Sequence, residues 1–116
     1  METDLQIKIR RVKDVRIVDL SGDVDTYTCV KLREAILDLL EEGNSRMIIG
    51  MANVSYIDSS GLGTLVGGLR RVNDQNGELV ISGANPQIRK VFSITGLSKV
   101  FPLFDNEEEA ARSLKR

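Results

Sequence analysis

Apolar and charged residues alternate along two segments near the start of the chain. Residues 5–10 and 15–20 both follow this period of two, and Lys13-Asp14 separates them. Because side chains two positions apart share one face of a strand, the pattern predicts a β-hairpin with one solvated face. The early basic residues fit that wet face better than a nucleic-acid-binding patch; they are Lys8, Arg10, Arg11, Lys13 and Arg16.

The following segment has the period of an amphipathic helix. Asp25 or Thr26 can cap its start, and Gly43-Asn44 can end it. Cys29 is the one cysteine of the chain, so it cannot form an internal disulfide, and its place in the apolar stripe predicts a buried thiol. The predicted core stripe of this helix consists of Cys29, Leu32, Ile36, Leu39 and Leu40.

Strands and helices then alternate along the rest of the chain. The apolar run 47–49, followed by Met51, predicts a strand that is covered on both faces. The later signals predict a helix over 60–73, a strand over 78–82, a helix from Pro86 to Gly96, a short edge strand within 100–104 and a terminal helix from 107 onwards. This order predicts the α/β class, as a single domain over 1–116 in which a mixed sheet of four to five strands packs with about four helices.

Composition and charge exclude several classes of function. Sixteen basic and 17 acidic residues leave a formal net charge of −1, so no overall field attracts nucleic acid or an acidic membrane surface. The chain has no histidine, the commonest metal ligand and general base, so neither a metal nor a cofactor is expected. It also has no signal-peptide pattern and no apolar run of bilayer length, so we expect a cytoplasmic protein.

The segment 54–64 carries the candidate chemistry. Asp58-Ser59-Ser60 stands where a strand gives way to a helix, whose first backbone N–H groups have no partner within the helix. Any of these three side chains can cap the helix, and one cap is enough. A serine nucleophile is disfavoured because there is no histidine to activate it, and no Gly-Lys-Ser or Gly-Lys-Thr sequence indicates a nucleotide phosphate loop. A regulatory hydroxyl remains the favoured role.

The helix over 60–73 has two unlike sides. Its predicted buried stripe consists of Leu62, Leu65, Val66, Leu69 and Val72. The opposite side has little side-chain bulk and should be flat; it consists of Ser60, Gly61, Gly63, Thr64, Gly67 and Gly68. A glycine inside a helix costs about 1 kcal/mol relative to alanine, so stability alone does not explain these glycines. Close approach of another protein explains them best, and tight packing within the domain is the alternative.

The motif Asp58-Ser59-Ser60-Gly61-Leu62-Gly63 resembles the phosphorylation-site motif of STAS domains, in particular of stand-alone bacterial anti-sigma factor antagonists. The acidic loop 20–25 and the segment 86–97 are also similar to this family, and the resemblance covers about residues 5–110. One departure is Gly50, where relatives usually carry an acidic or amide residue. This departure leaves the geometry near the site open.

By this resemblance, Ser59 is the phosphoacceptor, and the chain is a regulator without enzymatic activity. The unphosphorylated form would bind an anti-sigma factor that is also a serine kinase, and so free a sigma factor. Phosphorylation of Ser59 would end the binding, and a metal-dependent serine phosphatase would restore it. The residues expected to contact the partner are Asp23, Asp25, Asp58, Ser60, Gly61, Leu62, Gly63, Thr64 and Gly67. The main alternative is a STAS subunit that docks constitutively in a transport or signalling assembly. A second alternative is a hydrolase that uses Ser59 as its nucleophile.

Overall fold

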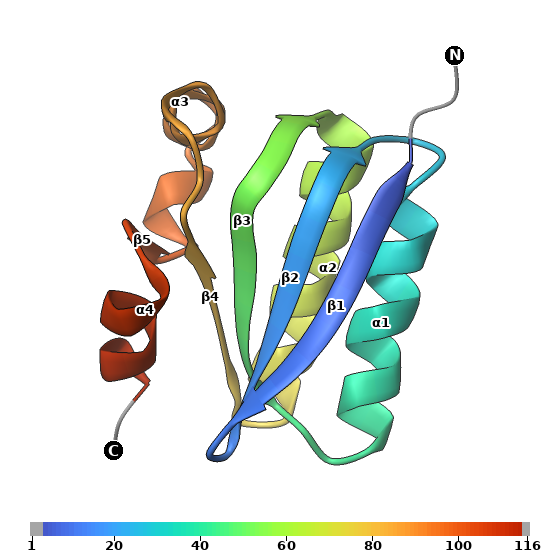
Figure 1. The fold of residues 1–116 in the computed structure, drawn as a ribbon, viewed down its shortest axis with the longest axis vertical. Coiled ribbons are helices and arrows are strands. Elements are labelled where there is room, and N and C mark those ends of the chain that lie inside the picture. Colours follow the sequence, from blue (N-terminus) through green and yellow to red (C-terminus); the bar gives the residue numbers. More distant parts are fainter. Residues whose placement is uncertain (1–3, 115–116) are drawn as a thin grey trace.

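The computed structural model describes residues 4–114, which contain one mixed sheet of five strands with helices on both faces. Residues 1–3, Lys115 and Arg116, which belong to the expected domain and its terminal helix, lie outside the described residues. The strands follow the order β1-β2-β3-β4-β5 across the sheet (Figure 1). Their bounds are β1 Leu5–Val12, β2 Val15–Val24, β3 Arg46–Ile57, β4 Glu78–Ser82 and β5 Leu103–Phe104.

The hairpin strand β1 is antiparallel to β2, and every other neighbouring pair of strands is parallel. The predicted α/β class, the mixed sheet and the edge position of the last strand are therefore confirmed. Within residues 4–114, four α-helices and one short 3-10 helix surround the sheet: α1 Cys29–Glu41, α2 Ser59–Asp74, α3 Pro86–Ile94, η1 Leu97–Lys99 and α4 Glu107–Ser113.

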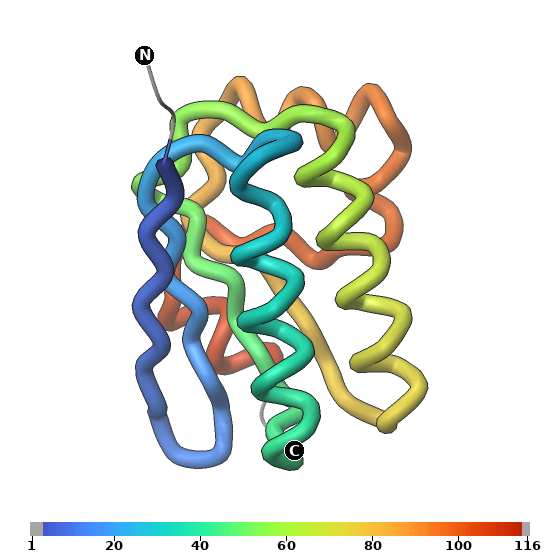
Figure 2. The backbone as a smooth tube through the Cα atoms, turned by 90° about the vertical axis from the view of Figure 1, so that its right-hand side faces the viewer, coloured from blue at the N-terminus to red at the C-terminus, as the bar shows by residue number. Residues whose placement is uncertain are grey.

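The helices form a layer on each face of the sheet. α1 and α2 lie side by side on one face (Figure 2), and α4 packs on the other. All five residues of the predicted α1 stripe are buried, and Cys29 among them is a buried free thiol, as expected. Among the helices of residues 4–114, none has the length and apolar character needed to cross a bilayer.

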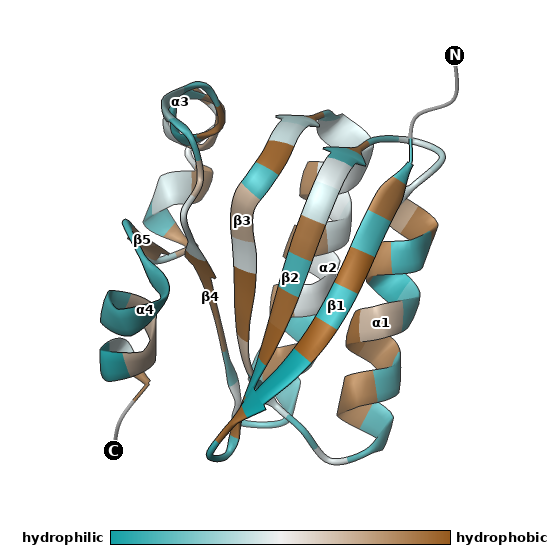
Figure 3. Cartoon of the chain, viewed as in Figure 1, coloured by the Kyte–Doolittle hydropathy of each residue, from teal (hydrophilic) through white to brown (hydrophobic). Residues whose placement is uncertain are grey.

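The central strands are apolar on both faces because both faces are covered. Figure 3 shows β1 alternating between hydrophobic and hydrophilic residues, whereas the middle of β4 is continuously hydrophobic. Met47 and Ile49 of β3 belong to the core beneath α1 and α2, Ile48 belongs to the core beneath α4, and all three are fully buried. The carboxyl ends of β2, β3 and β4 lie at one end of the sheet, where the chain turns into α1, α2 and α3 (Figure 1). The turns that follow β2 and β3 hold the candidate site.

Candidate functional site

Asp58 is the N-cap of α2. Its backbone is extended, with φ −105° and ψ −173°, and its Oδ1 accepts a hydrogen bond of 3.0 Å from the amide of Gly61. The amide of Asp58 donates to the carbonyl oxygen of Val24 at 3.1 Å, which joins the start of α2 to the end of β2. Because Asp58 caps the helix, neither Ser59 nor Ser60 is needed for that task.

Ser59 is the first residue of α2, and its side chain is exposed. Its hydroxyl has no hydrogen bond to any described residue, and the amides of Ser59 and Ser60 have no acceptor within residues 4–114. Amides at a helix N-terminus carry partial positive charge, which favours an anion nearby. A phosphate group on Ser59 would therefore lie next to unpaired amides of its own chain.

Ser60 connects α2 to the turn that follows β2. Its hydroxyl oxygen lies 3.1 Å from that of Thr26, and its carbonyl oxygen accepts a hydrogen bond of 3.0 Å from the Thr64 hydroxyl. Sequence reasoning misses Thr26 as a site residue, because parallel pairing of β2 with β3 is what brings the two hydroxyls together. Residues 34 positions apart thus form one polar surface beside Ser59.

Asp25 shapes the turn between β2 and α1. Its Oδ1 accepts hydrogen bonds from the amides of Tyr27 and Thr28, both at 2.9 Å. α1 begins only at Cys29, with Thr28 at the N-cap position and no side-chain cap. The expectation that Asp25 or Thr26 caps this helix is therefore wrong, because the carboxylate binds amides of a separate turn that precedes the helix.

The ends of β2 and β3 add exposed groups to this surface. Asp23 is half-buried near the end of β2, and its carbonyl oxygen accepts a hydrogen bond of 2.7 Å from the Thr28 hydroxyl. Tyr27 and Tyr56 are 84% and 54% exposed. Large exposed aromatic side chains often anchor protein interfaces. Neither tyrosine is assigned a contact role from the sequence alone, although Tyr56 lies within the segment 54–64 that carries the candidate chemistry.

The open part of α2 is narrower than the sequence predicts. An added Cβ at Gly63 or Gly67 would meet nothing within 4 Å, so these two glycines leave open space as expected. The expected flat shape is wrong, because α1 lies beside α2 and the two helices form a groove there. The buried stripe is rotated relative to the predicted one. The buried residues are Gly61, Leu65, Gly68 and Val72, and Leu62, Thr64, Val66 and Leu69 are half-buried.

Gly61 and Gly68 pack inside the domain. An added Cβ at Gly61 would lie 2.7 Å from side-chain carbons of both Ile57 and Val24, and one at Gly68 would lie 2.9 Å from the tip of Ile36. The expectation that these two glycines lie on the exposed side is wrong, because α2 needs them to approach the sheet and α1 closely. Tight internal packing, the alternative weighed for the glycines, therefore explains two of the four.

Comparison with known proteins decides the family. The STAS domain model matches residues 6–110, which is most of the chain. The chain belongs to the STAS domain family. This STAS domain is 30% identical over 113 residues to the anti-sigma F factor antagonist of Paenibacillus polymyxa, covering 97% of each chain. It is 34% identical over 105 residues to an anti-sigma-B factor antagonist of Staphylococcus epidermidis, covering 90% of this chain and 97% of the relative.

The fold of this STAS domain also matches solved structures. A crystal structure of an anti-sigma factor antagonist from Mycobacterium paratuberculosis superposes with a TM-score of 0.88 over 97% of this chain and 95% of that chain. At 23% identity, this match concerns the fold alone. The family and the fold implied by the motif are therefore confirmed.

The departure from the STAS pattern at Gly50 lies away from Ser59. Gly50 is in β3, in register with Asp19 and Ser82, and lines a hollow with residues of the turn before α4. An added Cβ at Gly50 would lie 2.7 Å from Oδ1 of Asp19. The other carboxylate oxygen of Asp19, Oδ2, forms an ion pair of 2.5 Å with Nε of Arg10. Gly50 thus makes room for this ion pair on the α4 side of the sheet, and the turn that holds Ser59 is formed without it.

Proposed function

We propose that this STAS domain is an anti-sigma factor antagonist that works as a phosphorylation switch. Its unphosphorylated form binds an anti-sigma factor with serine kinase activity and thereby releases a sigma factor. The proposal is supported by relatives that align over nearly the whole chain and are named as anti-sigma factor antagonists. The observation that carries it is the Ser59 hydroxyl, which is exposed and forms no hydrogen bond to residues 4–114, at the start of a helix that Asp58 already caps.

The electrostatics of the turn explain how one phosphate could end the binding. Phosphorylation would add a charge of about −1.5 to −2 at Ser59, beside amides that favour an anion in the free protein. Asp23, Asp25 and Asp58 already make this end of the sheet acidic. A docked partner would have to bury the phosphate next to these carboxylates, and an unpaired buried dianion costs several kcal/mol. The phosphate is therefore tolerated in the free domain and opposed in the complex.

The domain itself needs no catalytic group or cofactor for this role. The kinase would transfer the terminal phosphoryl group of ATP to Oγ of Ser59 and release ADP and a proton. A metal-dependent serine phosphatase would hydrolyse the phosphate ester and return the domain to its binding form. We place the domain in the cytoplasm, where sigma factors bind RNA polymerase, and we assign all of residues 1–116 to this single domain.

The test uses Ser59→Ala with Ser60→Ala as its matched control. Each purified protein is incubated with the anti-sigma factor kinase of the same organism and ATP, and the intact mass and the affinity for the kinase are measured. The wild type and Ser60→Ala should gain one phosphate and lose affinity. Ser59→Ala should gain none and keep its affinity, because Asp58 still caps α2.

Other outcomes of this test have distinct meanings. Full incorporation of phosphate into Ser59→Ala would move the site to Ser60 or elsewhere. Binding of the wild type without any phosphate transfer would favour constitutive docking. Hydrolysis of generic esters by the wild type alone, lost in Ser59→Ala, would favour a hydrolase.

A further inference from the structure

A groove of about 420 Å³ runs between α1 and α2. Ser60, Gly63 and Gly67 of α2 line it, and all three are among the residues expected to contact a partner. Arg33 of α1 and Arg71 of α2 line the same groove. Figure 2 shows the two helices side by side, with nothing lying over them on their outer face in this view.

Neither of these arginines is engaged within the described part of the chain. Both are exposed, and neither has an ion pair or a side-chain hydrogen bond to residues 4–114. An arginine side chain presents a planar fork of N–H donors that matches the two oxygens of a carboxylate. Because the groove also offers the open backbone of Gly63 and Gly67, a partner's main chain can approach it closely.

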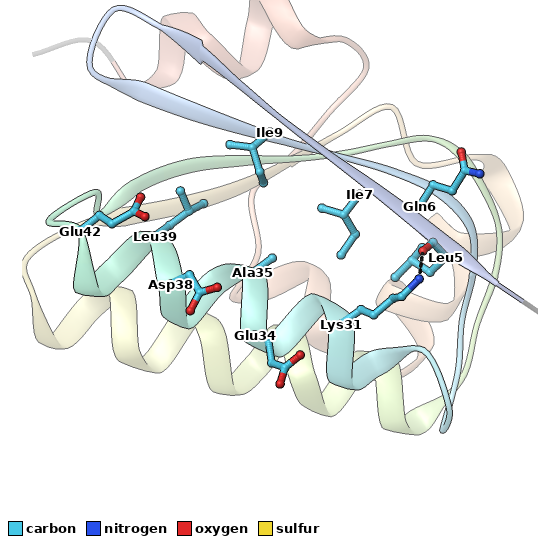
Figure 4. Close-up of a pocket in the computed structure, with 10 residues that line it drawn as sticks. All are labelled: Leu5, Gln6, Ile7, Ile9, Lys31, Glu34, Ala35, Asp38, Leu39 and Glu42. Atoms are coloured by element: carbon cyan, nitrogen blue, oxygen red, sulfur yellow. Dashed lines mark hydrogen bonds between the residues drawn. The ribbon is translucent and has the colours of Figure 1, made fainter.

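The opposite flank of α1 carries charge of the other sign. Glu34, Asp38 and Glu42 line a larger hollow of about 700 Å³ between α1 and β1 (Figure 4). The one basic residue among those that line this hollow, Lys31, is already engaged, with Asp4 and the carbonyl oxygen of Leu5, both at 3.0 Å. An acidic segment would therefore be repelled by the hollow and attracted by the groove between the helices.

We propose that the groove between α1 and α2 binds an acidic segment of the anti-sigma factor, whose aspartate or glutamate side chains pair with Arg33 and Arg71. This inference rests on the proposed function and adds a second contact to it. Ser59 does not line the groove. The arginine pair therefore orients and holds the partner, while the hydroxyl of Ser59 switches the binding, and the two contacts can be altered separately.

The test compares Arg33→Glu and Arg71→Glu with Arg70→Glu. Arg70 precedes Arg71 on α2, is exposed and does not line the groove, so its reversal makes the same change in net charge. The dissociation constant for the unphosphorylated kinase complex is measured by calorimetry at low and at high salt. Loss of one charge-assisted pair should weaken binding about tenfold for Arg33→Glu and for Arg71→Glu, and the change should shrink at high salt. Arg70→Glu should stay within about twofold of the wild type.

A second measurement detects the contact directly. Arg33→Lys and Arg71→Lys place a primary amine in the groove, and a zero-length carbodiimide then joins an amine to a carboxylate that it touches. Mass spectrometry should find each new lysine linked to an aspartate or glutamate of the kinase, with no such link from Lys31 on the other flank of α1. A wild type that binds no kinase overturns both the proposed function and this inference. If the wild type binds the kinase and is phosphorylated, two results overturn this inference alone. One is an equal loss of affinity in the three Glu variants, and the other is the absence of a crosslink from the new lysines.

Discussion

The variants Gly61→Ala and Gly63→Ala test the difference between a glycine of α2 that packs inside the domain and one that faces open space. Each substitution adds one methyl group near the start of the same helix. At Gly63 the new Cβ meets nothing within 4 Å, so helix propensity should stabilise the domain by up to about 1 kcal/mol. At Gly61 the new Cβ would lie 2.7 Å from carbons of Val24 and Ile57 and 2.9 Å from the Val24 carbonyl oxygen. The backbone oxygen cannot rotate away as a side chain can, so the first turn of α2 has to shift.

The magnitude of the difference follows from packing. Helix propensity favours alanine at both positions, so the two variants should differ by the overpacking at Gly61, which costs about 1–3 kcal/mol. Urea denaturation followed by circular dichroism measures this as a lower midpoint for Gly61→Ala than for Gly63→Ala, with similar slopes. Equal midpoints would refute the reasoning, because they would mean that α2 moves away from β2 and β3 without loss of stability.

Four further predictions concern single contacts. Asp58→Ala should lower the free energy of unfolding by about 1 kcal/mol in urea melts, whereas Asp58→Asn, which keeps an acceptor for the Gly61 amide, should lower it by less. Asp25→Asn should slow phosphorylation of Ser59 in a kinase time course more than it lowers the melting temperature, because an amide oxygen can still accept from Tyr27 and Thr28; equal kinetics with a lower melting point would make Asp25 a purely structural residue. Gly67→Gln should leave stability equal or higher in the same urea melts and weaken kinase binding in a titration, since its side chain would project from an open surface. Arg10→Met should destabilise the domain by about 1 kcal/mol or less at low salt and by a smaller amount in 1 M NaCl, because partly exposed Arg10 joins Asp19 to Glu107 of α4 through ion pairs that salt screens.

Much of the fold follows from local patterns in the sequence. The stripe of α1 is buried in full because a period of 3.6 residues places all its members on one side of the helix. α3 begins as predicted, with Asn85 accepting a hydrogen bond of 2.9 Å from the Ile88 amide and Pro86 in the first turn. The apolar run 47–49 predicts a strand that is covered on both faces, because consecutive strand residues point to opposite faces and all three are apolar. All three are fully buried in β3.

The parts that could not be predicted depend on contacts between distant segments. The side of α2 that is buried cannot be told from its leucines alone, because Gly61 and Gly68 let Val24, Ile57 and Ile36 fill the space that larger side chains would occupy. The start of α1 is displaced because Asp25 stabilises its own turn, and a sequence pattern does not distinguish this from a helix cap. The charge of the groove between α1 and α2 arises only when the two helices lie side by side, which is why Arg33 and Arg71 carry no signal in the sequence.

The hydrogen bonds that join Ser60 to Thr26 and Asp58 to Val24 make the proposed phosphorylation site a product of folding. The two turns come from segments more than 30 residues apart, and parallel β2–β3 pairing must form before they meet. A nascent or unfolded chain carries the motif 58–63 without the surface around it. A peptide with residues 54–64 should therefore be a poor kinase substrate. The kinase would then respond only to the concentration of folded antagonist. Proteolysis or misfolding of this domain would then act on the regulatory system in the same direction as phosphorylation, by removing the binding form.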